Sequence, residues 1–359
     1  MSKKYYRLDN ILKLNAVYNM IIGQRSNGKT YSTLEYAVNR YIKYGEEFAY
    51  VRRYEDECKP SELNKLFDNK PIEKWTNGRY QKIIYYQSSF WGCIETKEGE
   101  YKRVDILGHR FILANQMDYK SYDYSKITTI IFDEFIAKLN YIFDEFIEFE
   151  NLLSTIIRKR DNVKIFMLGN TINKYCPYFQ EMGLYNVKKQ VQGTIDFYNY
   201  GVSNTTVAVE YCEPLKDVES KINHSKYFGF NNPKLKMITT GVWELDIYPH
   251  LPMKYKPNNV LFSYFIDLEG DKIKCDVVAV ENNVFMYFYP KTTDLKYYDN
   301  EIVFQTSFDS NPLHHRNILK CDTKYGNIIK RLFKDNRDFY SSNDVGDVVK
   351  NYINNCANL

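Results

Sequence analysis

Four residues, Gly23, Gly28, Lys29 and Thr30, have the spacing GxxxxGK[ST] of a loop that binds phosphate groups. Glycines let the backbone turn its N–H groups towards phosphate oxygens, and the lysine and hydroxyl can contact the β and γ phosphates and a magnesium ion. An apolar run at 17–22 precedes the loop and a helical pattern follows it, as this motif requires. The sequence therefore predicts a site for ATP and Mg²⁺, with Thr30 as a magnesium ligand. The predicted nucleotide-binding residues of the loop are Gly23, Gln24, Arg25, Ser26, Asn27, Gly28, Lys29 and Thr30.

The hexapeptide IFDEFI occurs twice, at 131–136 and at 142–147. The first copy completes a run rich in β-branched residues that starts at 126, as expected for a central parallel strand. A carboxylate at the end of such a strand can hold magnesium, and a neighbouring glutamate can orient the attacking water. We therefore predict that Asp133 is the magnesium carboxylate and that Glu134 is the catalytic base.

The second copy has the pattern of the first turns of an amphipathic helix. Apolar residues recur at spacings of three and four from 142 to 156, and acidic residues cluster at 144–150, near the positive end of the helix dipole. This setting explains the acids without any chemistry. We expect Glu145→Gln to leave ATP turnover largely intact, whereas Glu134→Gln should abolish hydrolysis and retain ATP binding.

Further polar residues are candidates for the hydrolytic site. Asn170 would lie at the carboxyl end of a strand beside the loop, either as a sensor of the γ-phosphate or as a turn residue. Arg158 and Arg160 end the acidic helix, where either could reach the γ-phosphate of a neighbouring subunit or complement the helix dipole. Four basic residues could contact a nucleic-acid backbone, although solvated surface charge is the commoner explanation: Arg52, Arg53, Lys102 and Arg103.

The composition is that of a globular protein with more than one core. The chain has 359 residues, of which 44% are hydrophobic, and a formal net charge of +4 that does not by itself require a nucleic-acid partner. The seven cysteines are scattered without metal or disulfide spacing, which is typical of reduced thiols in a cytoplasmic protein. Charges interrupt the N-terminal segment, and no later run reaches about 18 apolar residues, so we expect neither a signal peptide nor a membrane span.

The pattern of elements predicts an α/β P-loop ATPase domain with a mainly parallel sheet, of the type that has an additional strand and a catalytic glutamate, followed by a smaller α+β domain. The expected bounds are 1–185 for the ATPase domain, 186–230 for a linker region and 231–359 for the second domain. Three strands between 260 and 290 form a meander like the opening of an RNase H fold. The acids that could serve a nuclease there are Asp267, Asp276, Glu281, Asp344 and Asp347, and their ordinary turn and helix positions favour an inactive domain.

One set of motifs is shared with a known family. It comprises the loop at 23–30, the block RYIKYGEEFAYVRR at 40–53, the strand end at 130–136, Asn170, and the segment 177–179. In these residues the chain resembles the genome-packaging ATPases, terminase-like DNA translocases, of small podoviruses whose DNA is capped by a terminal protein.

The resemblance implies a homo-oligomeric ring in the host cytoplasm that sits transiently at the portal vertex of an empty capsid and drives double-stranded DNA inward with ATP. It implies that Arg158 acts in trans, with Arg160 as the fallback. It also implies that the C-terminal domain resembles an RNase H fold without a working metal site and binds DNA or the portal. A structural packaging RNA is a further partner of some members, and no pattern in this sequence indicates it.

Two other functions fit the same motifs. A P-loop helicase or translocase of replication or recombination would separate forked DNA strands, which a packaging motor would not do. A capsid-associated binding protein with a vestigial phosphate loop would not turn over ATP.

Overall fold

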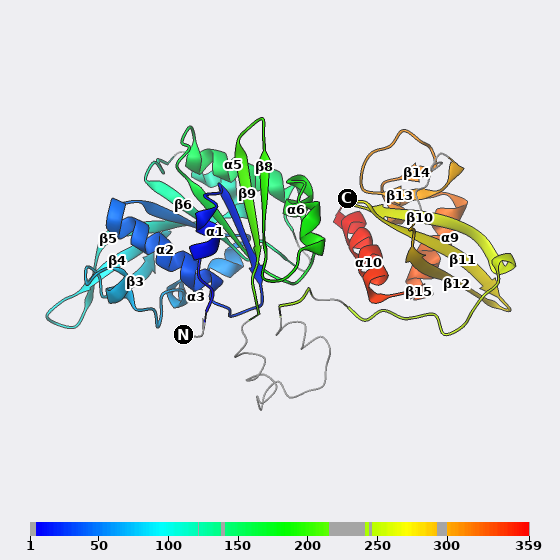
Figure 1. Cartoon of the computed structure of the whole chain (residues 1–359), viewed down its shortest axis with the longest axis horizontal. Coiled ribbons are helices and arrows are strands. Elements are labelled where there is room, and N and C mark those ends of the chain that lie inside the picture. Colours follow the sequence, from blue (N-terminus) through cyan, green and yellow to red (C-terminus); the bar gives the residue numbers. More distant parts are fainter. Residues whose placement is uncertain are drawn as a thin grey trace, which may run out of the picture. The chain divides into compact units, whose positions relative to one another are not determined.

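The computed structural model describes residues 5–120, 122–137, 141–214, 241–243, 246–292 and 300–358. The chain divides into two compact units, Met1–Glu244 and Leu245–Leu359. Each unit contains its own sheet (Figure 1). Across the described residues, no helix is both long enough and apolar enough to cross a membrane.

The first unit is built on a large sheet whose middle strands are parallel. Among the described residues its nine strands lie in the order β3-β4-β5-β2-β6-β7-β1-β9-β8. The strands from β5 to β9 in this order are parallel, and only the outer pairs β3-β4, β4-β5 and β8-β9 are antiparallel. Their bounds are β1 Tyr18–Gly23, β2 Glu47–Arg52, β3 Lys82–Tyr86, β4 Ser89–Glu95, β5 Tyr101–Ile112, β6 Ile127–Asp133, β7 Lys164–Asn170, β8 Ile195–Tyr200 and β9 Thr205–Tyr211.

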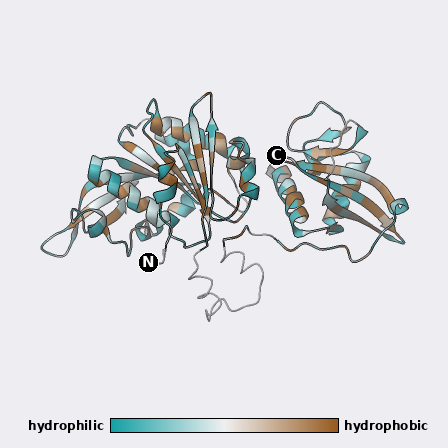
Figure 2. Ribbon diagram, viewed as in Figure 1, coloured by the Kyte–Doolittle hydropathy of each residue, from teal (hydrophilic) through white to brown (hydrophobic). Residues whose placement is uncertain are grey.

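Helices cover both faces of this sheet. One core layer packs against α1, α2, α3 and α4, and the other packs against α5 and α6 (Figure 1). In Figure 2 the hydrophobic colour is concentrated along the central strands, as expected for parallel strands buried on both faces. The helices are α1 Asp9–Lys13, α2 Lys29–Tyr44, α3 Pro60–Lys65, α4 Ile72–Trp75, α5 Glu145–Ile157 and α6 Pro177–Glu181, with 3₁₀ turns η1 Glu55–Cys58, η2 Leu113–Tyr119 and η3 Tyr185–Lys189.

The strand order confirms the predicted fold class. Strand β7 lies between β1, which leads into the phosphate loop, and β6, which carries the first acidic pair. This is the predicted additional strand. The carboxyl ends of all three parallel strands therefore meet at one edge of the sheet, where ligands of such sheets bind.

The predicted boundary between the domains was wrong. The segment 186–230 was expected to be a linker, but residues 195–211 form β8 and β9, and β9 pairs in parallel with β1. The run TTVAVEY at 205–211 is rich in β-branched residues, so burial beside β1 explains this strand. The division between the units falls at 244/245, and the rest of the expected linker, from 215 on, lies outside the described residues.

The second unit is the predicted α+β domain. Its described strands lie in the order β14-β13-β10-β11-β12-β15, and the antiparallel meander of β10, β11 and β12 is the one expected from the sequence. The strands are β10 Val260–Leu268, β11 Asp271–Val280, β12 Asn283–Pro290, β13 Val303–Gln305, β14 His314–His315 and β15 Asp338–Tyr340, with helices α9 Lys324–Lys334 and α10 Asn343–Asn358 and 3₁₀ turns η4 Pro257–Asn259 and η6 Ile318–Lys320.

Candidate nucleotide site

The phosphate loop runs from the end of β1 to the first turn of α2. Gly28 caps the helix with φ of 99°, a left-handed conformation that glycine adopts without strain. A Cβ atom there would also lie 3.2 Å from Cβ of Tyr5, so the N-terminal segment crosses close to the loop. Backbone N–H groups and the start of α2 are thus placed where they can hold an anion.

Lys29 is a buried cation held by neutral groups. Its Nζ donates to the carbonyl oxygens of Gly23 at 3.2 Å and Gln24 at 2.8 Å, and to Oδ1 of Asn170 at 3.3 Å. Burial lowers the pKa of Lys29 to about 8. A phosphate group would provide the anionic partner that such a buried ammonium favours, so the loop fits a nucleotide.

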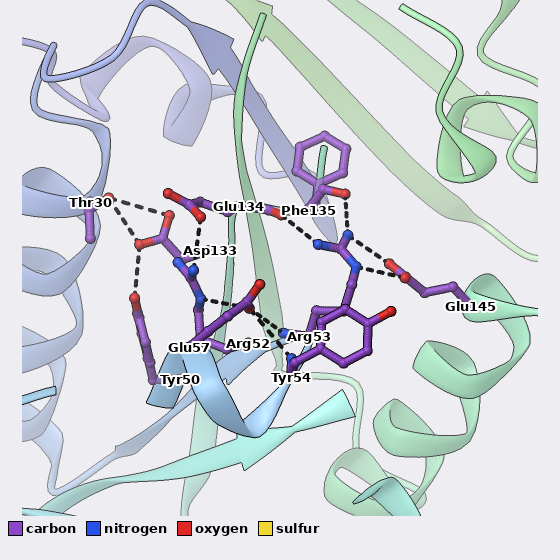
Figure 3. Close-up of polar contacts among 10 residues, drawn as sticks. All are labelled: Thr30, Tyr50, Arg52, Arg53, Tyr54, Glu57, Asp133, Glu134, Phe135 and Glu145. Carbon is purple, nitrogen blue, oxygen red and sulfur yellow. Dashed lines mark hydrogen bonds and ion pairs between the residues drawn. The ribbon is translucent and has the colours of Figure 1, made fainter. Parts of the chain in front are cut away.

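Asp133 and Thr30 converge on one point at the end of β6. The Thr30 hydroxyl donates to the two carboxylate oxygens at 3.2 and 3.4 Å, and the Tyr50 hydroxyl donates to Oδ2 at 2.9 Å (Figure 3). Burial raises the pKa of the Asp133 carboxyl, and the nearby Arg52 and the hydroxyl of Tyr50 oppose that rise. A carboxylate and a hydroxyl beside a phosphate loop are oxygen ligands of the kind that Mg²⁺ prefers, so the residues fit this ion.

Glu134 follows Asp133 but points to a different partner. Its backbone has φ of 61°, which turns the chain at the end of β6, and its side chain is 54% exposed. Nη2 of Arg52 donates to Oε2 of Glu134 at 2.8 Å, and the same guanidinium contacts Glu57 at 3.2 Å. The prediction that Arg52 is a solvated surface charge was therefore wrong, because this side chain is only 13% exposed and joins two carboxylates.

Arg53 connects the two copies of IFDEFI. Its Nε and Nη2 donate to the Glu145 carboxylate at 2.7 and 2.8 Å, while Nη1 and Nη2 donate to the backbone carbonyls of Glu134 at 3.2 Å and Phe135 at 2.8 Å (Figure 3). Burial alone lowers the pKa of Arg53, but the hydrogen bonds and charge of Glu145 outweigh burial and raise the pKa above its usual value. Glu145 also accepts hydrogen bonds from the hydroxyl of Tyr178 at 2.9 Å and the backbone N–H of Ile142 at 2.8 Å.

This geometry corrects one expectation about the sequence. Arg53 is not a surface charge, since it is 4% exposed. Glu145, expected to have a structural setting at the start of the helix, is 2% exposed and paired with Arg53. A buried bidentate ion pair in which each guanidinium nitrogen has an acceptor is a rigid connection between the end of β2, the turn after β6 and the start of α5.

Most of the predicted site residues line one cavity of about 730 Å³. Asn170 lies in register with Gly23 at the end of β7, beside the loop, as predicted. Tyr5, Tyr31, Asn69 and Lys70 form another part of the lining, which the sequence did not indicate because they come from separate elements. The lining residues from the predicted set are Arg25, Ser26, Asn27, Gly28, Lys29, Thr30, Asp133, Glu134 and Asn170, whereas Gly23 and Gln24 contribute the carbonyls that bind Lys29.

Arg158 and Arg160 lie elsewhere, after the last turn of α5. Arg158 is exposed, and its Nη2 donates to the carbonyl of Tyr122 at 2.8 Å. The guanidinium of Arg160 donates to backbone carbonyls near the start of β6, including that of Ser125 at 2.8 Å, and to the carbonyl of Ile156 in α5 at 2.7 Å. Arg160 therefore fastens the end of α5 to the segment before β6.

Sequence reasoning missed Tyr50, Arg52 and Arg53 as parts of the site. A hydroxyl and two guanidinium groups near the carboxyl end of a buried strand could have indicated that these residues belong to the site, because ligands of parallel sheets bind at this end of the strands. The partner Glu145 lies 92 positions away in the chain, and no local pattern could reveal it.

Three features define the class of this fold: a phosphate loop between a strand and a helix, an additional strand beside the first one, and an Asp-Glu pair at the end of the next strand. They are those of the P-loop ATPases that have an additional strand and a catalytic glutamate. Within this class the chain belongs to the Podovirus DNA encapsidation protein (Gp16) family, whose model matches residues 1–83 and 96–221.

Curated relatives are named as DNA packaging proteins. The chain is 33% identical over 178 residues to the DNA packaging protein of Bacillus phage phi29, and this match covers 49% of each chain. It is also 33% identical over 180 residues to the DNA packaging protein of Bacillus phage B103, covering 48% of this chain and 50% of that one. The matches thus span about half the length of these curated relatives.

A solved structure extends the likeness of the fold to nearly the whole chain. A chain of the bacteriophage Phi-29 viral genome packaging motor assembly is similar with a TM-score of 0.57 and 21% identity, covering 97% of both chains. At this level of identity the likeness shows the fold.

Proposed function

We propose that this protein is an ATP-driven motor that moves double-stranded viral DNA into a preformed capsid. The observation that carries the proposal is the cavity where Lys29, Thr30, Asp133, Glu134 and Asn170 meet, which lies within the part of the chain that matches the family. The curated relatives, named as DNA packaging proteins, support the choice of cargo.

The residues of the cavity divide the chemistry between them. Lys29 and the loop N–H groups bind the phosphates, while Thr30 and Asp133 hold Mg²⁺, which neutralises charge on the phosphate oxygens when bound. Glu134 orients the attacking water and accepts its proton. The side-chain oxygen of Asn170 accepts a hydrogen bond from the Lys29 ammonium. A γ-phosphate that binds Lys29 would break this hydrogen bond, so Asn170 would respond to the presence of the γ-phosphate, as a sensor residue does.

The position of Arg158 favours action on a neighbouring subunit. Arg158 contacts the segment just before β6, whereas Asp133 ends the same strand. Seven residues of strand separate the two ends by about 20 Å, too far for a guanidinium to reach the γ-phosphate in its own subunit. Arg158 is exposed and can serve a neighbour in a ring, whereas the backbone contacts of Arg160 favour a structural role.

A mixing experiment tests the arginine in trans. In a mixed ring, a Lys29→Ala subunit supplies Arg158 to the intact loop of an Arg158→Ala neighbour, so two inactive variants mixed in equal amounts should regain about a quarter of the active sites. Lys159→Ala is the matched control, since it removes an exposed cation next to Arg158. A mixture that stays as inactive as its parts would place the role of Arg158 within its own subunit or outside catalysis.

The second unit has a non-cutting role in this proposal. Among its described residues, no group of three His, Cys, Asp or Glu side chains is placed to hold a metal ion. Asp276 is buried and accepts hydrogen bonds from three hydroxyl groups, those of Ser263 at 2.6 Å, Tyr255 at 2.9 Å and Tyr289 at 3.0 Å. Asp267 accepts a hydrogen bond from the N–H of Gly270 at the turn after β10. These contacts favour structural roles for both acids. The unit would then bind DNA or the portal.

Protection of DNA from nuclease tests the whole proposal. Purified empty capsids, DNA, ATP and this protein should yield DNA that nuclease cannot digest, and the Glu134→Gln protein should give none. Fully digestible DNA under conditions where ATP is hydrolysed would contradict the motor function. Strand separation of a forked substrate would favour the helicase, and absence of Mg²⁺-dependent turnover would favour a binding protein with a vestigial loop.

A further inference from the structure

The antiparallel end of the first sheet carries aromatic and basic side chains on one face. Lys82 of β3, Cys93 of β4 and Arg103 of β5 lie directly opposite one another across the three strands, so they share a face. Alternation along the strands adds Tyr86 on β3 and Tyr101 on β5 to the same face. We call Lys82, Tyr86, Tyr101 and Arg103, with Trp91 of β4, the β3–β5 platform.

The two faces of these strands differ in what they contact. Ile83, Tyr85 and Phe90 point to the other side and belong to the core that packs against α3 and α4. The platform residues have the opposite parity, and Tyr86 and Tyr101 remain 42% and 43% exposed. In Figure 1 the three strands extend to one side of the central parallel strands of the unit, with β3 as the last strand of the sheet. The core therefore does not use the rings of the platform.

Each exposed ring has a cation over its face. The guanidinium of Arg103 lies 4.0 Å from the ring centroid of Tyr86, and Nζ of Lys82 lies 5.1 Å from that of Tyr101. Such contacts hold a flexible basic side chain close to the sheet, where its charge can meet a phosphate while a neighbouring ring stacks on a base. Glu95 of β4 lies directly opposite Tyr101 and shares the platform face at the end towards the β4–β5 turn, whereas Lys82 and Arg103 lie further along the strands, opposite Cys93.

We propose that the β3–β5 platform binds single-stranded nucleic acid, with Tyr86 and Tyr101 stacking on unpaired bases and Lys82 and Arg103 contacting phosphates. Unpaired bases are the ligand that matches exposed rings beside cations on an antiparallel sheet, because a base in a duplex has no free face. The family model does not include residues 84–95, which supply Tyr86 and Trp91, whereas Lys82, Tyr101 and Arg103 lie within the residues that it matches.

Binding of labelled oligonucleotides to the full chain without nucleotide tests this. The probes are a short oligouridylate, an oligothymidylate of the same length and a mixed-sequence duplex, followed by fluorescence anisotropy. The double variant Tyr86→Ala, Tyr101→Ala should weaken binding of the single-stranded probes by about tenfold or more, with the duplex affected far less. Changing both residues to Phe keeps the rings and should retain binding. Arg103→Gln should reduce the salt dependence of binding by about one phosphate contact.

The matched control is Tyr44→Ala on α2. Tyr44 is 53% exposed and has Arg40 at 4.3 Å over its ring, but it lies on a helix without a second stacking ring in register. It should leave all three affinities unchanged, and all variants should hydrolyse ATP at the same basal rate. A loss confined to oligouridylate or to oligothymidylate supports the platform and assigns it to RNA or to DNA.

Several outcomes would overturn the proposal. Equal weakening of duplex binding would mean that the platform contacts a duplex backbone. Unchanged binding of every probe, or an equal loss with Tyr44→Ala, would remove nucleic acid as the specific ligand. A loss of ring assembly by the double variant, with probe affinity per subunit unchanged, would assign the face to contact with a second copy of this chain.

Discussion

The two copies of IFDEFI have identical residues and opposite exposure. In the first copy Phe132 is completely buried, whereas the equivalent Phe143 is 73% exposed. The glutamates are reversed, since the Glu134 side chain is 54% exposed and that of Glu145 is fully buried. The first copy ends a strand that is buried on both faces, and the second begins a helix with one buried face, so the same letters meet different surroundings.

The comparison also shows how the copies cooperate. The Glu145 carboxylate binds Arg53, and Arg53 binds the backbone carbonyls of Glu134 and Phe135. The second copy therefore supports the turn that carries Glu134 of the first. In the proposed mechanism one copy has the chemical role and the other has a positioning role.

Glu134→Gln should have the largest effect on activity. An amide cannot accept a proton from the attacking water, so we expect the rate of ATP hydrolysis to fall by about a thousandfold while ATP binding persists. Single-turnover hydrolysis and nucleotide binding by filter retention measure the two properties. The comparison between the copies would break if the variant still hydrolysed ATP at a rate close to that of the wild type.

Glu145→Gln should act first on stability. It leaves the Arg53 charge buried without a carboxylate, which should lower the free energy of unfolding by about 3 kcal/mol. Loss of the fixed turn should also reduce kcat, with KM for ATP changed less. This replaces the expectation that turnover stays largely intact.

The double variant Arg53→Met, Glu145→Leu separates the two effects of this change. Replacing both charges by apolar groups should recover most of the stability, because no unpaired charge remains. It should not recover kcat, since the carbonyls of Glu134 and Phe135 still lack their donor. Recovery of both properties would show that Arg53 contributes only to folding.

The paired changes Phe132→Ala and Phe143→Ala compare the copies without touching a charge. Removing the completely buried ring should cost about 3–5 kcal/mol, whereas removing the exposed ring should change stability by less than about 0.5 kcal/mol. Chemical denaturation followed by circular dichroism measures both. Similar costs would mean that a partner or another part of the chain covers Phe143.

The aspartates give the smallest expected difference. The pKa of the Asp133 carboxyl is raised by burial, so the folded state holds this proton more tightly than the unfolded state. The contribution of this group to stability is therefore present below the unfolded pKa and is lost as the pH rises through the folded pKa. Asp133→Asn should therefore raise Tm by a few degrees at neutral pH without nucleotide. Asp144→Asn, the equivalent change in the second copy, should leave Tm unchanged. A lower Tm for Asp133→Asn would contradict this account.

Much of the nucleotide site could be predicted from local sequence. Each part of the site has a recognisable residue pattern within about ten residues: the loop at 23–30, the strand before Asp133 and the run before Asn170. The parallel sheet brings the ends of these segments together. Arg53 and Glu145 could not be predicted, because a surface charge and a buried ion pair have the same local pattern. The boundary after 185 was missed for a similar reason, since pairing of β9 with β1 joins residues 189 positions apart.

A double-mutant cycle of the two glutamates tests the division of roles most directly. Single-turnover hydrolysis is measured for Glu134→Gln, Glu145→Gln and the protein with both changes, at a temperature where all are folded. If Glu145 acts by positioning Glu134, its change should slow the wild-type protein and have no further effect once Glu134 is glutamine. Rate losses that multiply, with Glu145→Gln slowing the Glu134→Gln protein as much as it slows the wild type, would show that the second copy acts independently of the first.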